Sequence, residues 1–144
     1  MITGLYGQAS GAFLTATVYF PVPVDELLEV AFLVDGGAAD TCISLTDLLR
    51  QSVEAARKIE IRPRRALRGV GGATPGLSTR AHIALTHEDS AVSHLELDVA
   101  LLLDPNVLGL PSVLGRDVLY RGHLHFDPSA GGVYFDAPKG SFVI

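Results

Sequence analysis

The sequence is poor in the features that would tie it to disulfide chemistry, secretion or a membrane. Its 144 residues include one cysteine, Cys42, so no disulfide can form within the chain, and a reducing compartment is expected. No apolar run approaches the roughly 18 to 20 residues of a membrane-spanning helix. The first charged residue is Asp25, so the basic start of a secretion signal is missing. We therefore expect a cytoplasmic protein with no membrane partner.

Charge is also scarce. Charged residues make up 19% of the chain and the formal net charge is −5, which argues against a nucleic-acid partner. The hydrophobic share of 48% is typical of a single well-cored domain. Most cations nevertheless gather between positions 50 and 80, where they form either a surface for an acidic partner or an ordinary solvated face. These cations are Arg50, Arg57, Lys58, Arg62, Arg64, Arg65, Arg68 and Arg80.

Two well-known kinds of site are missing their key residues. The glycine-rich stretch at 69–72 is not followed by Gly-Lys-Ser or Gly-Lys-Thr, so it does not predict a nucleotide site. Cys42 lies in the segment TCIS, which is typical of a buried strand thiol rather than of a nucleophile paired with histidine.

The segment HLHFD, 123–127, has the spacing of a metal site but favours a simpler interpretation. His123, His125 and Asp127 would share one face of a strand, yet no fourth ligand is evident. The simpler interpretation places Leu124 and Phe126 in the core and the three polar side chains in solvent. We expect neither a metal nor a cofactor.

Short apolar segments bounded by glycine and proline predict a mainly β chain. One amphipathic helix is expected over SLTDLLRQSVEAARK, with Ser44 or Thr46 as its N-cap, and a brief second helix is expected after Gly115. The apolar stripe of the first helix would consist of Leu45, Leu48, Leu49 and Val53. The expected strands are 12–20, 27–34, 41–44, two strands around a glycine tip within 64–85, 93–103, a short strand before Gly115, 123–127, 132–136 and the C-terminal GSFVI.

Three features carry the chemistry, and they follow one another in a fixed order. In FLVDGGAADT, 32–41, an apolar strand ends on Asp35. The segment RGVGG, 68–72, is the tip of a hairpin, and VLGRD, 113–117, joins two apolar residues to glycine, arginine and aspartate. An isolated carboxylate is expensive to hold beside a buried strand, so its position calls for an explanation.

In this order and spacing the sequence resembles the retropepsin-like aspartic proteases, the half-sized relatives of pepsin. The resemblance covers about residues 27–127. It implies one retropepsin-like domain over residues 1–144, folded as an acid-protease-type closed β-barrel-like lobe with one or two short helices. The hairpin at about 64–85 would be the flap that closes over a bound peptide.

The resemblance implies an aspartic endopeptidase whose catalytic residue is Asp35. Hydrolysis by carboxylates needs two acids, one charged to activate a water and one protonated to polarise the peptide carbonyl. Asp89 lacks the following glycine and lies in the polar segment HEDSA, which leaves Asp35 as the single candidate. The second acid would come from another copy of the chain, so a homodimer acting on peptides or proteins is implied, with activity shifted to acidic pH.

The other site residues are carried over from the same resemblance. Residues expected to contact the substrate are Gly37, Ala38, Val70, Gly71 and Gly72. Gly36, Leu114, Gly115 and Arg116 would support the loop that carries Asp35, with Arg116 as a structural ion-pair partner rather than a catalytic group.

Gly36 is where the chain departs from the family, which has threonine or serine after the aspartate. In the family that hydroxyl bonds to the partner loop, and two such bonds at about 1 kcal/mol each would be lost here. Pairing of the C-terminal GSFVI with a second copy is expected to compensate. Two alternatives follow, a weakened endopeptidase or a module that binds extended peptides without cleaving them. A third interpretation makes Asp35 only a turn residue, because Asp-Gly is a common turn signal.

Overall fold

A computed structural model describes residues 1–7, 11–22, 24–60, 64–69, 72–102, 109–127, 129 and 131–144, with side chains except those of 59–77. The described residues form one mainly β unit with three short helices. The helices are α1 (Leu45–Gln51), α2 (Val53–Glu60) and α3 (Arg116–Leu119). The strands are β1 (Ile2–Gly7), β2 (Gly11–Phe20), β3 (Glu26–Val34), β4 (Cys42–Ser44), β5 (Arg64–Gly69), β6 (Gly72–Thr86), β7 (Val92–Leu102), β8 (Val113–Leu114), β9 (His123–Asp127), β10 (Gly132–Asp136) and β11 (Gly140–Val143).

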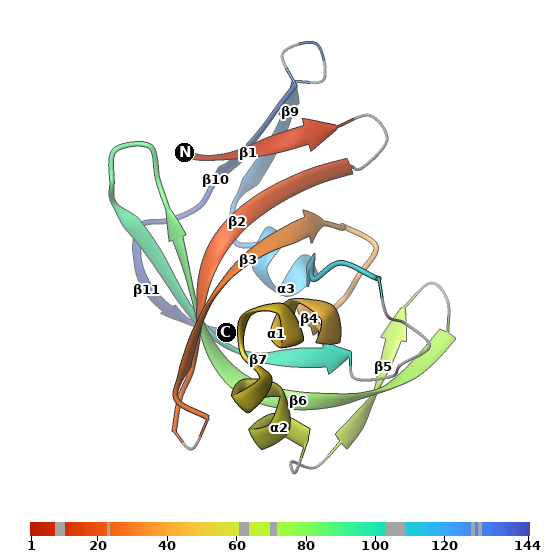
Figure 1. Ribbon diagram of the computed structural model, residues 1–144. Helices are drawn as coiled ribbons and strands as arrows, with labels where there is room; N and C mark the ends of the chain where they lie inside the picture. The colour runs from red at the N-terminus through yellow and green to blue at the C-terminus, as the bar shows by residue number, and fades with distance from the viewer. Residues whose placement is uncertain are drawn as a thin grey trace.

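The strands form a single sheet that closes on itself in its central part. Its order is β5-β6-β7-β4-β8-β3-β2-β1-β10-β9, and β6 also pairs with β2, so the strands from β6 round to β2 make a ring (Figure 1). The β5–β6 hairpin and the β9–β10 hairpin stand at opposite ends of the molecule (Figure 1). The large fully buried side chains include Phe20, Phe32 and Phe135, from strands of different parts of the chain.

The alternation of apolar and polar residues explains the central hairpin. Along β2 every second residue is buried, including Leu14 and Val18, and β3 continues the pattern with Leu28 and Phe32. The two strands pair antiparallel over eight positions from Phe13↔Leu33 to Phe20↔Glu26. A half-buried sheet with this alternation is what the residue pattern predicts, and both strands are confirmed.

The expected single helix over 44–58 is wrong, because the chain breaks it at Ser52. The Ser52 N–H closes α1 on the carbonyl of Leu48 (2.7 Å), and the Ser52 hydroxyl then accepts the Ala55 N–H (3.1 Å) to cap α2. With α3, the described residues hold three helices rather than one or two. The N-cap of α1 is Ser44, whose side chain accepts the Asp47 N–H.

The predicted apolar stripe of this region is only partly right. Leu48 is buried and Leu45 packs partly against the core, but Leu49 and Val53 are exposed. Ala55 and Ala56 of α2 take the buried positions instead, because the break at Ser52 rotates the second half of the stripe. None of the helices in the described ranges has the length and apolar character needed to cross a membrane.

The C-terminal segment GSFVI does form a strand, but its partner is in its own chain. Strand β11 pairs parallel with β7, from Gly140↔Ser93 to Val143↔Glu96. The Ile144 N–H extends this pairing to the carbonyl of Glu96 (2.8 Å). This pairing uses one edge of β11, and the expected pairing of the segment with a second copy stays a prediction.

Candidate functional site

The loop that carries Asp35, residues 35–41, joins the end of β3 to the start of β4. The Ala38 N–H donates to the Asp35 carbonyl (3.2 Å) across a turn whose two central residues are Gly36 and Gly37. The Gly37 N–H donates to Oδ1 of Asp35 (2.8 Å). Among the described residues, this is the hydrogen bond that the Asp35 carboxylate accepts.

Strand β8 passes between the two strands that this loop connects. It pairs parallel with β3 through Leu33↔Val113 and Val34↔Leu114, and antiparallel with β4 through Cys42↔Val113. The loop thus connects two strands that both pair with β8. An arrangement of this kind fixes the position of Asp35 through backbone pairing rather than through its own side chain.

Three hydrogen bonds join the Asp35 loop to the segment Leu114–Arg116. The Asp35 N–H donates to the Leu114 carbonyl (3.2 Å) and the Arg116 N–H donates to the Ala38 carbonyl (2.9 Å). The buried Gly115 N–H donates to the Thr41 hydroxyl (3.1 Å). Leu114 and Gly115 therefore contact the Asp35 loop through these hydrogen bonds, as expected of residues that support it. Arg116 contributes its backbone, and the ion pair expected of its guanidinium stays a prediction.

Gly115 lies so close to the loop that a side chain there would collide with backbone. A Cβ at this position would lie 2.5 Å from the carbonyl carbon of Asp40 and 2.6 Å from its oxygen. Carbon atoms in a well-packed interior do not approach this closely. The glycine of VLGRD is therefore required by the contact between α3 and the Asp35 loop.

Thr41 and Asp117 complete the support, and sequence reasoning missed both. Asp117, in the first turn of α3, accepts the Thr41 N–H (3.0 Å) on one carboxylate oxygen and the Thr41 hydroxyl (2.6 Å) on the other. Thr41 is fully buried, so these bonds are shielded from water. A helix-start carboxylate and a threonine before a strand are common features, so neither residue alone signals this pairing.

Removing the Thr41 hydroxyl should loosen the loop measurably. In Thr41→Val the buried Gly115 N–H loses its acceptor and Asp117 loses a donor, which is expected to cost about 2 to 3 kcal/mol. Thermal unfolding should show a fall in Tm of roughly 5 to 10 °C. The matched control Thr41→Ser keeps the hydroxyl and should lose about 1 kcal/mol. A larger loss in Thr41→Ser than in Thr41→Val would show that the methyl group, not the hydroxyl, matters, because valine keeps the methyl group and serine does not.

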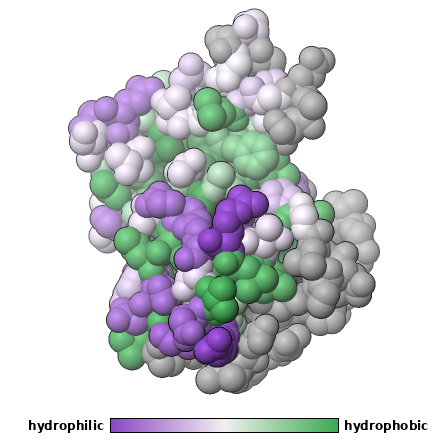
Figure 2. Space-filling view, in the orientation of Figure 1, coloured by the Kyte–Doolittle hydropathy of each residue, from purple (hydrophilic) through white to green (hydrophobic). Residues whose placement is uncertain are grey.

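A row of apolar side chains leads from the neighbourhood of Asp35 across the sheet. The register aligns Leu5 with Phe13, Phe13 with Leu33 and Leu33 with Val113, on four adjacent strands. Leu5 is 78% exposed and the other three are half-buried. Figure 2 shows hydrophobic surface over the part of the molecule where β1, β2 and β3 lie. A groove of about 530 Å³ follows this face, lined by Thr3, Gly4, Leu5, Tyr6, Gly7, Phe13, Thr15 and Ala31.

The flap residues are described only in part. Gly72 begins β6 and is the register partner of Gly69, so a β5–β6 hairpin of the expected kind is present. Val70 and Gly71 lie outside the described residues. Of the substrate-contacting residues, the structure thus places Gly37, Ala38 and Gly72, and it brings Gly37 and Ala38 into the Asp35 loop.

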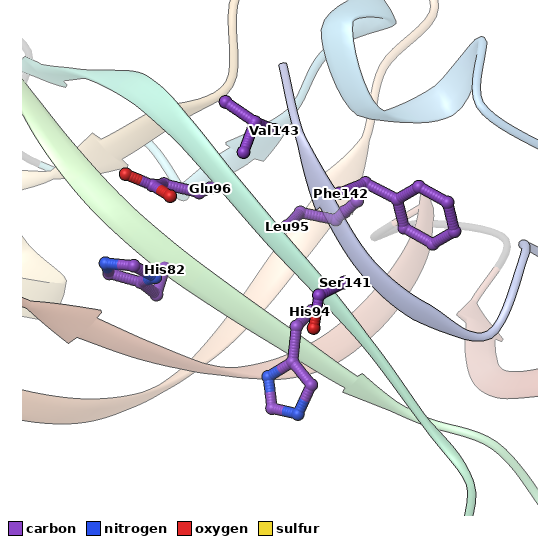
Figure 3. A pocket seen from close by; sticks show the side chains of 7 residues that line it. All are labelled: His82, His94, Leu95, Glu96, Ser141, Phe142 and Val143. Carbon is purple, nitrogen blue, oxygen red and sulfur yellow. The ribbon is translucent and has the colours of Figure 1, made fainter.

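A second hollow, of about 390 Å³, lies away from Asp35 between β6, β7 and β11. His82, His94 and Glu96 line it from the outer face, but His94 points away from the other two (Figure 3). Within the described ranges no three His, Cys, Asp or Glu side chains come close enough to hold a metal ion, at this hollow or along HLHFD. The hollow therefore provides no clear chemistry of its own.

The basic stretch between positions 50 and 80 is largely paired where its side chains are described. Arg57 forms an exposed ion pair with Glu54 (3.0 Å), and Arg80 contacts Glu96 (3.3 Å) and Asp98 (3.5 Å). Lys58 donates to the carbonyl of Val24 (3.1 Å). Exposed pairs of this kind contribute little energy. The side chains of Arg62, Arg64, Arg65 and Arg68 lie outside the described ones, so both interpretations of the basic stretch stay predictions.

Comparison with known proteins adds no family to this geometry. No model of a known protein family matches the sequence, and the search of curated proteins finds no match. The function must therefore be argued from the Asp35 loop itself.

Proposed function

We propose that this chain is an aspartic endopeptidase with an acid-protease-type fold, active as a homodimer in which each copy contributes Asp35. The observation that carries the proposal is the way Leu114, Gly115 and Arg116 hold the Asp35 loop from β8 and α3. A simple surface turn does not need a strand such as β8 between its two flanking strands, or a buried threonine, to fix the position of its aspartate. A catalytic carboxylate does, because its position must be held to within a fraction of an ångström.

The exposure of the loop supports approach by a second copy. Gly36 and Gly37 are both exposed, and a Cβ built at Gly36 meets no heavy atom of the described residues within 4 Å. Two such loops could meet across a twofold axis without side chains between them. Each Asp35 would then face the other, and the pair would share one proton.

The chemistry follows from that shared proton. The ionised carboxylate takes a proton from a water, whose oxygen attacks the peptide carbonyl carbon, while the protonated carboxyl donates a hydrogen bond to the carbonyl oxygen. The resulting tetrahedral intermediate collapses when its nitrogen accepts a proton from the pair of Asp35 carboxyl groups and the C–N bond breaks. Closure of the β5–β6 hairpin would exclude bulk water during these steps.

The row from Leu5 to Val113 indicates the kind of peptide that would be cut. An extended substrate beside Asp35 would place alternate side chains against Phe13, Leu33 and Val113, which are apolar and partly open to solvent. Burial of apolar side chains there would supply binding free energy of roughly 25 cal/mol per Å². Peptides with apolar residues at the cleavage site are therefore the proposed substrates.

Gly36 decides between cleavage and simple binding of peptides. Gly36→Thr is expected to raise activity at low protein concentration by about tenfold or more, because each hydroxyl adds a hydrogen bond of about 1 kcal/mol across the dimer. The measurement is the cleavage rate of a peptide library against protein concentration at acidic pH. The open space around Gly36 means that the threonine fits within its own chain.

The control for this experiment is Gly36→Val, which has the shape of threonine without its hydroxyl. Both variants stiffen the turn equally, so a gain found with threonine alone assigns the effect to the hydroxyl. Equal behaviour of the two would remove the proposed contact between loops. A chain that captures extended peptides yet cleaves none, with glycine or threonine at 36, would instead be the peptide-binding module.

A further inference from the structure

Strand β9 ends the sheet and has one open edge. It pairs with β10 through five consecutive positions, from His123↔Asp136 to Asp127↔Gly132, and no described strand lies on its other side. The edge therefore presents backbone N–H and C=O groups to solvent at the end of the molecule where the β9–β10 hairpin projects (Figure 1).

The apolar face of β9 is incompletely covered. Leu124 packs partly against the core, but Phe126 is 50% exposed, although it was expected to point into the core. Its ring packs against the Tyr6 ring in a T-shaped arrangement, with centroids 6.2 Å apart. Its register partner on β10 is the fully buried Val133. The hydrophobic core thus extends to the open edge of β9, where the large side chain of Phe126 is its outermost residue.

Strand β9 is short and ends on the charged Asp127, but three devices that often protect an edge strand, namely lysine, proline and a bulge, are missing from it. The segment HLHFD contains no lysine, proline or glycine, and its one-to-one register with β10 has no bulge. An unprotected edge with an exposed aromatic residue is suited to pairing with another strand. The question is which strand fits.

We infer that β9 pairs antiparallel with β9 of a second copy of this chain, with the twofold axis between the two His125 residues. In this register His123 lies opposite Asp127 of the second copy, and Leu124 lies opposite Phe126. Each of these pairs occurs twice because the contact is symmetric. The imidazole and carboxylate groups are complementary, and each Phe126 gains an apolar neighbour across the axis.

The alternative registers fit less well. Residues that lie opposite each other in an antiparallel pair have their side chains on the same face of the sheet. The register can therefore change only in steps that keep residues of one face opposite each other. A shift toward the start of β9 sets His123 opposite His125 and removes Asp127 from the pairing. A shift toward its end sets Phe126 opposite itself and leaves His123 and Leu124 unpaired. Only the register centred on His125 uses all five residues.

This contact does not rest on catalysis, and it is an interface separate from the one that would bring two Asp35 loops together, because β2, β1 and β10 lie between β3 and β9 in the sheet. Dimer formation can be measured in an Asp35→Asn chain, so failure of the β9 contact and failure of the peptidase proposal are separate results.

Cysteine cross-linking tests the register directly. Opposite residues of an antiparallel pair have Cα atoms about 4.5 to 5.5 Å apart, within the range that a disulfide spans. His125→Cys should therefore form a disulfide-linked dimer under mild oxidation. His123→Cys should not, because its two copies would lie roughly 13 Å apart along the strands. The unmodified chain, with Cys42 alone, is measured in parallel.

A second measurement uses sedimentation velocity over a range of concentrations. Phe126→Lys is expected to weaken the dimer by at least about tenfold, because it places a charge at the centre of the paired face. Phe142→Lys is the matched control, since Phe142 is 36% exposed on β11, away from this edge, and should leave the dimer unchanged. Cross-linking of His123→Cys as fast as His125→Cys, equal effects of the two lysines, or a monomer at all concentrations would overturn the inference.

Discussion

Asp35→Asn is expected to reduce peptide cleavage by on the order of 1,000-fold, the range found when a group that transfers protons in the reaction is removed. Asparagine has the size of aspartate, and its amide oxygen can still accept the Gly37 N–H that now binds Oδ1. It cannot act as a base toward water. The fold should therefore survive while the chemistry is lost.

The assay compares initial cleavage rates of a peptide with apolar residues at the cleavage site, at acidic pH and matched protein concentration. Thermal unfolding of both chains serves as the control, and the Tm values should agree within about 3 °C, or roughly 1 kcal/mol. Cleavage that survives in Asp35→Asn would mean that Asp35 is only a turn residue and that the hydrolysis comes from elsewhere.

Gly115→Ala is expected to have the largest effect on stability. The added Cβ would lie 2.5 Å from the backbone of Asp40 and 2.9 Å from the Thr41 nitrogen, so the Asp35 loop or α3 must shift. Overpacking against backbone typically costs 1 to 3 kcal/mol and sometimes more, and we expect about 3 kcal/mol here. Chemical denaturation would measure this as a lower midpoint with an unchanged slope.

Gly36→Ala provides the comparison within the same region, because a Cβ at Gly36 meets no described heavy atom within 4 Å. Its stability should change by less than about 1 kcal/mol. A large loss in both variants would point to a general need for glycine in this loop. A small loss in both would mean that α3 does not press on the loop as the geometry indicates.

The strands were largely predictable because their residues alternate. Val30 and Phe32 in β3, and Leu97 and Val99 in β7, follow the period of two that a half-buried strand requires. Strand β1 was not predicted, because its two glycines interrupt the pattern. One of them, Gly4, packs so closely that a Cβ would collide with the Phe13 carbonyl oxygen, a requirement visible only after β1 and β2 are paired.

The site was predictable where residues close in sequence do the work. The bonds within Asp35–Ala38 follow from the Asp-Gly-Gly turn itself. The contacts between Thr41 and Asp117 join residues 76 positions apart, and those between β8 and β3 join distant segments as well. Such long-range pairs depend on topology, so a single sequence could suggest them only through a resemblance.

The exposed Phe126 is a further case in which local pattern gave the wrong environment. Alternation correctly placed Leu124 and Phe126 on the core-facing side of β9, but it could not show that β9 would be the last strand. Burial at the edge of a sheet depends on what lies beyond it. The same apolar alternation is therefore compatible with two environments for Phe126: burial in the core of its own chain, or a contact with another chain at the sheet edge.

Mixing wild-type chain with Asp35→Asn tests the central claim most directly. If the active site takes one Asp35 from each copy, a mixed dimer holds a single carboxylate and is inactive. An equimolar amount of the variant should then lower the activity per wild-type chain to about half, and a tenfold excess to about one tenth, once dimers exchange. Activity per wild-type chain that stays constant, or a wild-type chain that cleaves no peptide, would contradict the account.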